Sequence, residues 1–330
     1  MEYIANENRY NNMKYRRVGD SGLVLPIVSL GLWHNFGSID NYENMVKMIE
    51  TAFDAGITHF DLANNYGPIP GSAESNFGKI INGPLKPYRD ELIISTKAGY
   101  TMWDGPYGDG GSRKYLIASL NQSLKRMNLD YVDIFYHHRM DFDTPLEETM
   151  SALASIVASG KALYVGLSNY DGENLKKATK ILNELNCPFI INQNKYSIFD
   201  RTIEKNGLKE TSDKLNKGIM VFSPLAQGLL TGRYLNGIPE DSRIAKSGRF
   251  LNKKDLTDDV HKKIVELNNI AISRNETLAQ MALSWVLKDD CITSVLIGAS
   301  KVEQILENVK IVDSKEFTKE EIAKIDSIIA

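Results

Sequence analysis

Residues 28–61, VSLGLWHNFGSIDNYENMVKMIETAFDAGITHFD, show the pattern that indicates the fold class. It opens with an apolar run and continues into a segment whose apolar residues recur at spacings of three and four. It ends in a second apolar run that follows Gly56. The two runs predict buried strands, and the middle spacing predicts an amphipathic helix that stops at the glycine. A helix that joins two apolar strands is typical of a parallel β-α-β unit.

The same alternation continues through the rest of the chain. Eight apolar runs occur, each ending in polar residues: Val28–Trp33, Thr58–Asp61, Leu92–Lys97, Val132–His138, Ala162–Ser168, Phe189–Asn192, Gly218–Ser223 and Thr293–Ile297. Eight parallel strands are the number that closes a (β/α)8 barrel. A doubly wound open sheet is the competing topology. It usually carries GxGxxG after its first strand, and the sequence contains neither this motif nor GxxxxGK[ST]. We therefore predict an α/β fold of the TIM-barrel type.

Three segments lie outside the eight repeats. Tyr15–Pro26 predicts a β-hairpin that plugs the amino-terminal end of the barrel, and Pro224–Asp258 is a long loop after the seventh strand, of the kind that covers a ligand. Thr318–Ile329 predicts an additional terminal helix capped by Thr318. The length of 330 residues fits one domain or two. Eight strand ends that share one face favour a single domain, 1–330, with residues 1–13 as a flexible extension.

Composition excludes several classes of function. Lys plus Arg number 39 and Asp plus Glu 42, so the net charge is -3, and a protein that binds nucleic acid along its backbone needs a positive field. The two cysteines, Cys187 and Cys291, have no CxxC or zinc-type spacing, which predicts no metal site and fits a reducing compartment. No apolar run approaches the length of a membrane span. We expect a cytoplasmic protein without a membrane partner.

Polar residues stand where several of the runs end. Asp61, Lys97 and His138 close three of them, and Tyr66 follows Asp61 on the next loop. Because the carboxyl ends of barrel strands meet on one face, we expect these side chains to lie together. Each has an ordinary alternative when taken singly: a strand-terminal Lys or Asp is usually solvated, and Tyr66 fits a turn. His137 and His138 are adjacent on a strand, so one of them must face the helices.

Together the four side chains suggest the reduction of a carbonyl group. An oxygen that becomes negative as carbon accepts hydride needs a proton donor. A free tyrosine has a pKa of about 10, and a neighbouring ammonium can lower it by roughly 1 to 3 units. We assign Tyr66 as the acid, Lys97 as the group that tunes it, Asp61 as the partner of the lysine and His138 as the group that orients the carbonyl.

The stretches that carry these residues resemble a known family. HFDLANNYG, IISTKAGY, YVDIFYHHR, YVGLSNY, SPLAQGLLTG and SVLIGASKVEQILEN are similar to signatures of the aldo-keto reductases, and the resemblance spans residues 23–308. Within that superfamily the chain is most similar to the branch that holds the potassium channel β subunits and bacterial glyceraldehyde 3-phosphate reductases. The resemblance implies a (β/α)8 barrel, NADPH as cofactor, and Asp61, Tyr66, Lys97 and His138 as the catalytic tetrad.

The resemblance also implies a set of cofactor-binding positions. They are Trp33, Asp61, Ser168, Asn169, Gln193, Tyr196, Ser223, Leu225, Gly228, Leu229, Gly298, Ser300, Lys301, Gln304 and Asn308. Hydroxyl and amide groups at 168, 169 and 193 suit a nicotinamide carboxamide, and the ring at 196 offers a flat face, although an aromatic there also fits core packing. The segment 223–229 suits a close approach to pyrophosphate, or it is a plain turn.

The segment around residue 300 bears on the choice of cofactor. Gly298 to Ser300 precede a helix that opens near Lys301, so free backbone N–H groups and a cation converge there. A ribose 2′-phosphate fits Ser300 and Lys301, whereas an NAD site usually places an acidic residue on the 2′-hydroxyl. We therefore predict NADPH/NADP+, with Gln304 and Asn308 beside the adenine as the resemblance implies.

Substrate residues are less strongly indicated. Trp33, Trp103 and Tyr107 are predicted to rim the barrel, and Arg113 and Lys114 open a helix that could bind a substrate phosphate. The alternative for that helix is an ordinary solvated start, and two rival cations are Arg139 and Arg249. The substrates that fit are small aldehydes, glyceraldehyde 3-phosphate and methylglyoxal among them.

Two other functions are weighed against the reductase. The first is a subunit that binds NADPH and senses redox state, as in the channel β proteins, with turnover incidental. The second is a metal-dependent lyase or hydrolase, which would need clustered His and carboxylate ligands at the strand ends. The branch also implies a homo-oligomer, a tetramer or larger.

Overall fold

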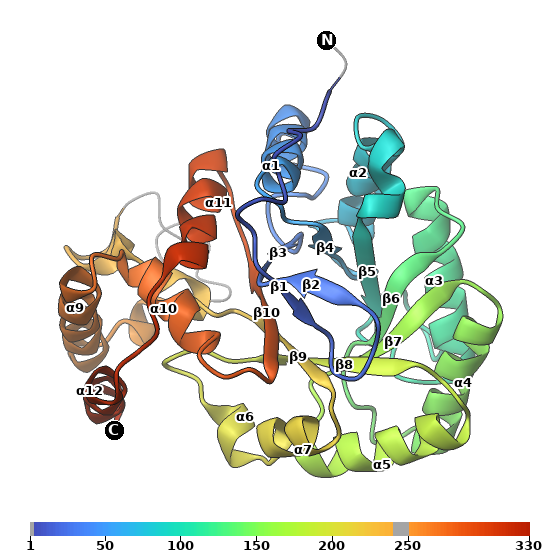
Figure 1. Ribbon diagram of the computed structural model, residues 1–330. Helices are drawn as coiled ribbons and strands as arrows, with labels where there is room; N and C mark the ends of the chain where they lie inside the picture. The colour runs from blue at the N-terminus through green and yellow to red at the C-terminus, as the bar shows by residue number, and fades with distance from the viewer. Residues whose placement is uncertain (1–2, 240–250) are drawn as a thin grey trace.

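The computed structural model describes residues 3–239 and 251–330, and it confirms the predicted barrel (Figure 1). Eight parallel strands close on themselves in the order β10-β3-β4-β5-β6-β7-β8-β9. They are β3 (Val28–Gly31), β4 (His59–Asp61), β5 (Ile93–Ala98), β6 (Val132–His137), β7 (Ala162–Ser168), β8 (Phe189–Lys195), β9 (Gly218–Phe222) and β10 (Ile292–Ile297). We call the face formed by their carboxyl ends the barrel mouth.

Helices fill the connections and surround the strands (Figure 1). The α-helices are α1 (Tyr42–Asp54), α2 (Ser72–Ile81), α3 (Arg113–Met127), α4 (Leu146–Ala158), α5 (Gly172–Glu184), α6 (Thr202–Lys205), α7 (Leu208–Lys214), α9 (Asp258–Ser273), α10 (Leu278–Val286), α11 (Val302–Val309) and α12 (Lys319–Ile329). Shorter 3-10 turns are η1 (Lys86–Glu91), η2 (Ala226–Gly228), η3 (Gly232–Tyr234), η4 (Lys253–Asp255) and η5 (Lys310–Asp313). Outward strand residues such as Phe60 and Phe135 pack against the apolar faces of these helices and form the main core.

The predicted hairpin closes the amino-terminal end of the barrel. β1 (Tyr15–Arg17) pairs antiparallel with β2 (Val24–Pro26), and the pair crosses in front of the barrel strands in Figure 1. Val18 and Leu25 are fully buried in a cluster with the barrel residues Met220 and Leu296. Gly19 permits this seating because its φ is 55° and a Cβ there would lie 2.1 Å from the carbonyl oxygen of Asn216.

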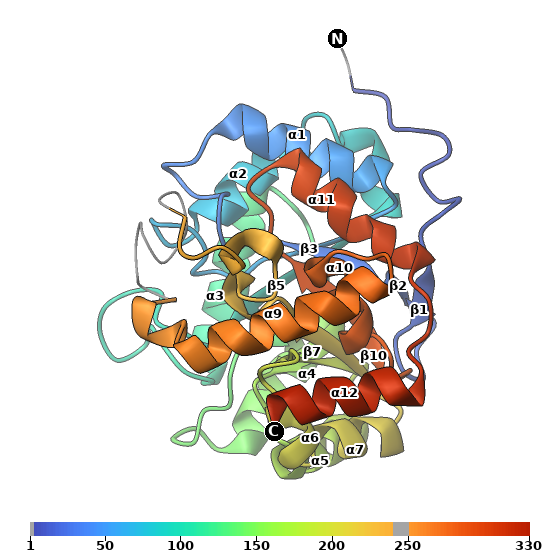
Figure 2. The same cartoon turned by 90° about the vertical axis from the view of Figure 1, so that its left-hand side faces the viewer.

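The segments outside the barrel pack on its helices. Residues 3–13 lie against α1, where the Tyr3 hydroxyl donates to Asp54 at 2.8 Å, while the flexibility expected for 1–13 stays a prediction. The long loop after β9 contains η2, η3 and η4, and residues 240–250 of it, with Arg249, lie outside the described residues. The predicted terminal helix is confirmed as α12, with Thr318 and Glu321 forming a capping box, and it lies beside α9 (Figure 2). No helix in the described ranges combines the length and the apolar character needed to cross a membrane.

A buried carboxylate joins β5 to the helices behind it. Glu74 of α2 is fully buried, accepts a hydrogen bond from the Thr96 hydroxyl at 2.5 Å and pairs with the Arg126 guanidinium at 2.7 Å. Thr96 directly precedes Lys97 in the strand. The pair therefore fixes the outer side of the strand whose inner side carries the lysine.

Replacing Arg126 with alanine should destabilise the fold. Glu74 would remain buried without its cation, and breaking such a pair from one side costs about 3 kcal/mol. Urea unfolding of Arg126→Ala and of Lys125→Ala, an exposed neighbour on the same helix, measures the difference. Equal stability of the two variants would show that the pair contributes nothing.

Candidate active site

The tertiary structure brings the four predicted catalytic side chains together at the barrel mouth. Asp61 ends β4, Lys97 is the next-to-last residue of β5, and His138 directly follows β6 and donates its backbone N–H to Ala98 at 2.9 Å. Tyr66 lies on the loop after β4, and its hydroxyl is 3.4 Å from the Lys97 ammonium. Adjacent parallel strands in register account for the proximity of the first three.

Lys97 is a fully buried ammonium with three hydrogen-bond partners. Its Nζ donates to Asp61 Oδ2 at 2.5 Å, to the Leu62 carbonyl at 2.6 Å and to the Tyr66 hydroxyl at 3.4 Å. An ammonium has three donors and no acceptor, so these bonds use all of them. The phenol oxygen of Tyr66 accepts from Lys97, which leaves its own O–H free to donate elsewhere.

Asp61 is held through both carboxylate oxygens. While Oδ2 takes the ammonium, Oδ1 accepts from the Ser95 hydroxyl at 2.6 Å and from Gln193 Nε2 at 3.2 Å. The Asp61 side chain is 2% exposed. Its orientation is therefore fixed by donors from β5 and β8, and the direction of the lysine is fixed with it.

Aromatic rings gather around Tyr66. The centre of its ring lies 6.3 Å from that of Trp33 and 6.0 Å from the His138 imidazole, and Tyr100 meets the same imidazole edge-on at 4.7 Å. These rings come from the loops after β3, β4 and β5 and from the end of β6. They form apolar walls beside the phenol, which strengthen electrostatic interactions there by excluding water.

Burial controls the protonation of these groups. It raises the pKa of Tyr66 well above 10, and Asp61 and Tyr100 act in the same direction. Burial also lowers the pKa of Lys97, although Asp61 and Glu74 oppose the change. The pKa of His138 falls well below 6.5 because of burial and the nearby charge of Lys97. The tyrosine pKa thus moves opposite to the direction expected from the lysine alone, because loss of hydration outweighs an ammonium 3.4 Å away. At neutral pH Tyr66 keeps its proton and His138 is neutral.

The two adjacent histidines divide as strand geometry requires. His138 lies at the mouth, whereas His137 Nδ1 is 2.7 Å from the Tyr170 hydroxyl on the outer side of the barrel. Burial lowers the pKa of His137 to about 4. The histidine that precedes Arg139 is therefore the one beside Tyr66.

Several predicted cofactor residues also reach the mouth. Ser168 and Gln193 are register partners at the ends of β7 and β8, and the Asn169 side chain bonds to the Ser168 hydroxyl and to the His138 carbonyl. Asn169, at φ 59°, and Ser223, at φ 54°, adopt the left-handed backbone region. Such strain in residues other than glycine concentrates at functional sites.

The turn after β9 continues this strained backbone. Ala226 and Gln227 have φ of 48° and 59°, and Gly228 has φ of 103°. Gln227 Nε2 donates to the Ser223 hydroxyl at 3.1 Å, which closes the turn on itself. Leu225 and Gly228 are partly exposed there and Leu229 is buried.

Tyr196 lies elsewhere. Its ring is fully buried 5.3 Å from that of Trp285, and its hydroxyl bonds to Glu204 at 2.5 Å and to Lys288 at 3.0 Å. These contacts lie outside the group around Tyr66, and the role predicted for this ring stays a prediction. Phe222, which is partly exposed at the carboxyl end of β9, is an aromatic that the sequence reasoning missed.

The segment after β10 forms a separate lobe of the candidate site. Gly298, Ser300 and Lys301 are exposed, and Lys301 is the N-cap residue of α11. Gln304 folds back so that its Oε1 accepts from the Ser300 backbone N–H at 2.8 Å. Asn308, one turn further along α11, is buried. The start of α11 and the exposed Lys301 place a helix amino terminus and a cation together, and Gln304 already takes the Ser300 N–H.

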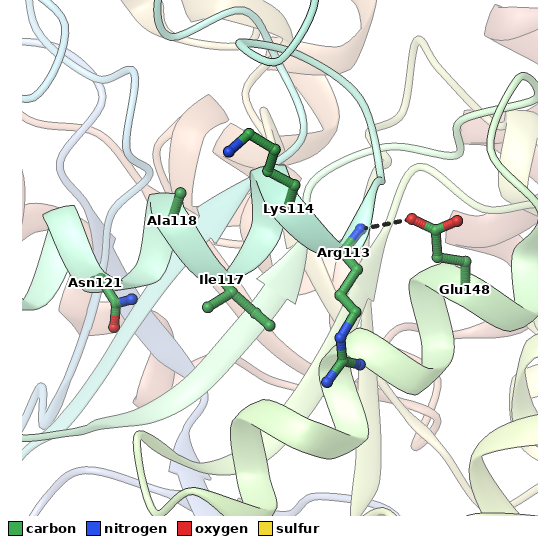
Figure 3. A pocket seen from close by; sticks show the side chains of 6 residues that line it. All are labelled: Arg113, Lys114, Ile117, Ala118, Asn121 and Glu148. Atoms are coloured by element: carbon green, nitrogen blue, oxygen red, sulfur yellow. Dashed lines mark hydrogen bonds between the residues drawn. The ribbon is translucent and has the colours of Figure 1, made fainter.

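The two predicted phosphate residues on α3 have different neighbours, Arg113 on α4 and Lys114 on the loop after β5. Figure 3 shows Arg113 and Lys114 at an open hollow beside α4, where Glu148 accepts a hydrogen bond from the Arg113 backbone N–H at 3.0 Å. The Arg113 guanidinium donates to the Ser151 carbonyl, and Lys114 lies 5.3 Å from the Tyr107 ring centre. A carboxylate of the chain itself thus already occupies this helix start.

Arg139 lies closer to the tetrad. Its guanidinium stacks on Tyr100 at 4.6 Å, donates to the Gly99 carbonyl and pairs with Asp109 at 2.7 Å. Tyr100 in turn contacts His138. Trp103, which packs 5.1 Å from Tyr115, and the exposed Tyr107 belong to the same loop after β5. This loop therefore supplies most of the predicted rim.

Three further side chains near the tetrad escaped the sequence reasoning. Ser95 and His59 precede Lys97 and Asp61 by two positions and so share their inward face, and Tyr100 follows on the loop. The period-2 alternation of β4 and β5 was a signal that could have found the first two. No pattern pointed to Tyr100, because loops have no periodicity.

Two buried histidines should make stability fall in mild acid. Burial holds the pKa of both His59 and His137 at about 4, against about 6.5 in the unfolded chain, so the unfolded state binds protons first as the pH falls. Their contribution is complete above pH 6.5 and is lost towards pH 4. Each should cost about 2 kcal/mol by pH 5.

Urea unfolding at pH 7.5 and pH 5 measures this loss. His137→Gln, which removes one of the two groups, should give a shallower fall between the same pH values. Constant stability of the parent protein across this range would contradict the assignment of neutral, buried imidazoles.

Comparison with known proteins agrees with this geometry. The sequence model described as the Aldo/keto reductase family matches residues 28–330. The L-glyceraldehyde 3-phosphate reductase of Escherichia coli strain K12 is 56% identical over 333 residues, covering 100% of this chain and 96% of that protein. A probable voltage-gated potassium channel subunit beta from Oryza sativa subsp. japonica is 34% identical, covering 96% of this chain and 97% of that protein.

The fold comparison leads to the same family. The crystal structure of a thermostable aldo-keto reductase in complex with the inhibitor epalrestat superimposes with a TM-score of 0.76 at 30% identity, covering 96% of this chain and 100% of that one. The family match covers nearly the whole barrel, and the 56% relative extends over the full chain. The chain is therefore an oxidoreductase of the aldo-keto reductase family.

Proposed function

We propose that this protein reduces small aldehydes to alcohols with NADPH and that Tyr66 donates the proton. The observation that carries the proposal is that all three N–H donors of the Lys97 ammonium are taken, by Asp61, Leu62 and Tyr66. That arrangement keeps the positive charge beside the phenol oxygen while the phenol O–H stays available. A carbonyl oxygen that gains negative charge would find both a donor and a nearby cation.

The donor set at the mouth fits a nicotinamide cofactor. Ser168, Asn169 and Gln193 offer one hydroxyl and two amides on neighbouring strand ends, which suit a carboxamide. The turn at 223–228, with left-handed φ at Ser223, Ala226, Gln227 and Gly228, suits a close approach to pyrophosphate, and Ser300 with Lys301 suits a phosphate. When bound, NADPH supplies the hydride.

Side chains of the protein then orient and protonate the carbonyl oxygen of the substrate. Neutral His138 donates a hydrogen bond to this oxygen and orients it, since its lowered pKa keeps it from carrying a charge. Tyr66 transfers its proton to the same oxygen as negative charge develops. The phenolate left behind is stabilised by Lys97, and Asp61 keeps the lysine in place. The rings of Trp33 and Tyr100 limit the access of water.

The substrates proposed are small aldehydes, including glyceraldehyde 3-phosphate, on which the 56% identical relative acts by its name, and methylglyoxal. Among the cations considered for a substrate phosphate, Arg139 is favoured over Arg113. It stacks on Tyr100 next to His138, whereas Arg113 is directed to α4. We further propose that the protein is cytoplasmic, as its composition suggests, and a homo-oligomer, as the resemblance to the channel β subunit branch implies.

Tyr66→Phe should lower kcat by roughly 100-fold to 10,000-fold because it keeps the ring and removes the proton. The matched control is Tyr131→Phe, at the opposite end of the barrel beside Arg89. Steady-state rates with NADPH and an aldehyde panel measure both variants. A Tyr66→Phe enzyme with the kcat of the parent would exclude Tyr66 as the acid.

Lys301→Met should raise the KM for NADPH about tenfold and leave the KM for NADH unchanged, because only the first carries a 2′-phosphate for the ammonium to bind. Lys319→Met, at the exposed start of α12, serves as the control. An equal effect on both cofactors would place the 2′-phosphate elsewhere.

A further inference from the structure

A line of polar side chains crosses the barrel interior below the tetrad. Ser294 Oγ is 2.7 Å from Ser29 Oγ, which is 2.9 Å from His59 Nδ1. His59 Nε2 is 2.9 Å from Ser95 Oγ, which is 2.6 Å from Asp61 Oδ1. The line runs from β10 through β3, β4 and β5, and we call these five residues the interior chain. The first four are fully buried.

The direction of every hydrogen bond in the interior chain can be derived. A carboxylate paired with an ammonium only accepts, so the Ser95 hydroxyl must donate to Asp61. Ser95 then accepts from His59, which places the imidazole proton on Nε2. Because burial lowers the pKa of His59 to about 4, the ring is neutral and its Nδ1 accepts from Ser29. Ser29 accepts from Ser294 in turn, and all four bonds point towards Asp61.

Packing alone does not explain the interior chain. Other inward positions of the barrel carry apolar residues of one buried cluster, Ile134, Ile191, Met220 and Leu296, and two of these pair in register with members of the interior chain, Met220 with Ser294 and Leu296 with Ser29. Apolar residues of that kind would fill the polar positions without needing partners. The chain also ends at Ser294, which is fully buried, so it does not lead to solvent and cannot deliver protons from outside. The interior chain therefore acts on Asp61, by orienting its carboxylate and stabilising its negative charge.

We propose that Ser95 and His59 are positioning residues for the reduction, which hold Asp61 in the orientation and charge state that keep Lys97 an ammonium beside Tyr66. The inference rests on the proposed function, since the step it supports is proton donation by Tyr66. Ser95 acts directly on Asp61 Oδ1, and His59 acts through Ser95. Hydrogen bonds that point in the same direction polarise one another, so the bond from Ser294 to Ser29 strengthens the bond from Ser95 to Asp61.

The consequence for catalysis is a shift along the pH axis. Besides Asp61, the groups that face the Lys97 ammonium are Tyr66, Tyr136 at 5.8 Å, Glu74 behind the strand and the neutral imidazoles of His59 and His138. Loss of the hydrogen bond from Ser95 leaves the Asp61 carboxylate less well oriented towards the Lys97 ammonium. The pKa of Lys97 then falls, because the negative charge nearest to it stabilises the ammonium less. The ammonium is then lost at lower pH, and the alkaline limb of the kcat profile moves to lower pH.

The experiment compares pH profiles of kcat for the parent, Ser95→Ala, Ser95→Thr and His59→Phe with NADPH and one good aldehyde substrate. Ser95→Ala should lose roughly tenfold in kcat at neutral pH and shift the alkaline limb downward by about one pH unit. His59→Phe should shift it in the same direction by less. Ser95→Thr keeps the hydroxyl and should restore the parent profile, and the KM for NADPH should stay unchanged throughout.

A matched control separates positioning from folding. Ser212→Ala removes the hydroxyl of a fully buried serine in α7, on the outer layer of the barrel, and should leave the profile unchanged. If Ser95→Ala lowers kcat at all pH values alike, with the alkaline limb in place, its role is structural and the inference is overturned. A parent profile in both Ser95→Ala and His59→Phe overturns it as well.

A second measurement does not depend on turnover. Nitrogen NMR of histidine-labelled protein, with His59 identified by its absence in His59→Phe, should show a neutral ring protonated on Nε2 at pH 6. A ring that is protonated on Nδ1, or is cationic at pH 6, overturns the direction derived for the interior chain. A protein without reductase activity but with the expected tautomer would instead count against the proposed function alone.

Discussion

The ion pair between Lys97 and Asp61 is the interaction on which the mouth of this barrel depends. An ammonium taken fully out of water is costly unless its charge is matched and its donors are satisfied. Here a carboxylate, a backbone carbonyl and a phenol meet both conditions. Each of these partners must then be held in place. Ser95 and Gln193 inside the barrel hold Asp61 by hydrogen bonds, and Glu74 behind the strand accepts a hydrogen bond from Thr96, the neighbour of Lys97.

The barrel interior is divided to meet this requirement. Ile134 of β6, Ile191 of β8, Met220 of β9 and Leu296 of β10 are apolar and cluster with Val18 and Leu25 of the amino-terminal hairpin. Ser29 of β3, His59 of β4 and Ser95 of β5, together with Ser294 of β10, form the connected polar chain. A buried hydrogen-bond network stabilises a structure only if its members are satisfied, and each link here has a partner of the right kind. The hydrogen bonds of the polar chain thus end on one carboxylate, that of Asp61.

Much of the fold could be read from local patterns. The eight strands, the hairpin and the helix capped by Thr318 follow from alternation, turn residues and capping, which act within a few residues of one another. The grouping of the four residues at the mouth could also be predicted, because the carboxyl ends of parallel barrel strands all lie on the same face of the barrel. The neighbours of Tyr196 and Arg113 were not accessible in this way, and the roles predicted for them stay predictions. Both stand near strand or loop ends in the sequence, yet Tyr196 turns to Trp285 and Arg113 to α4.

Strand period and strand order leave little freedom in placing Asp61, Lys97 and His138, so the residues at the barrel mouth follow from local sequence. The chemistry of these residues depends on the folded structure. It shows that burial raises the pKa of Tyr66, that Lys97 has no unused donor, and that His59, two positions before Asp61, hydrogen-bonds to the serine that donates to Asp61. The physical reason is that the pKa of a group depends on its hydration and on charges within a few ångströms. Those neighbours come from strands and helices far apart in the chain.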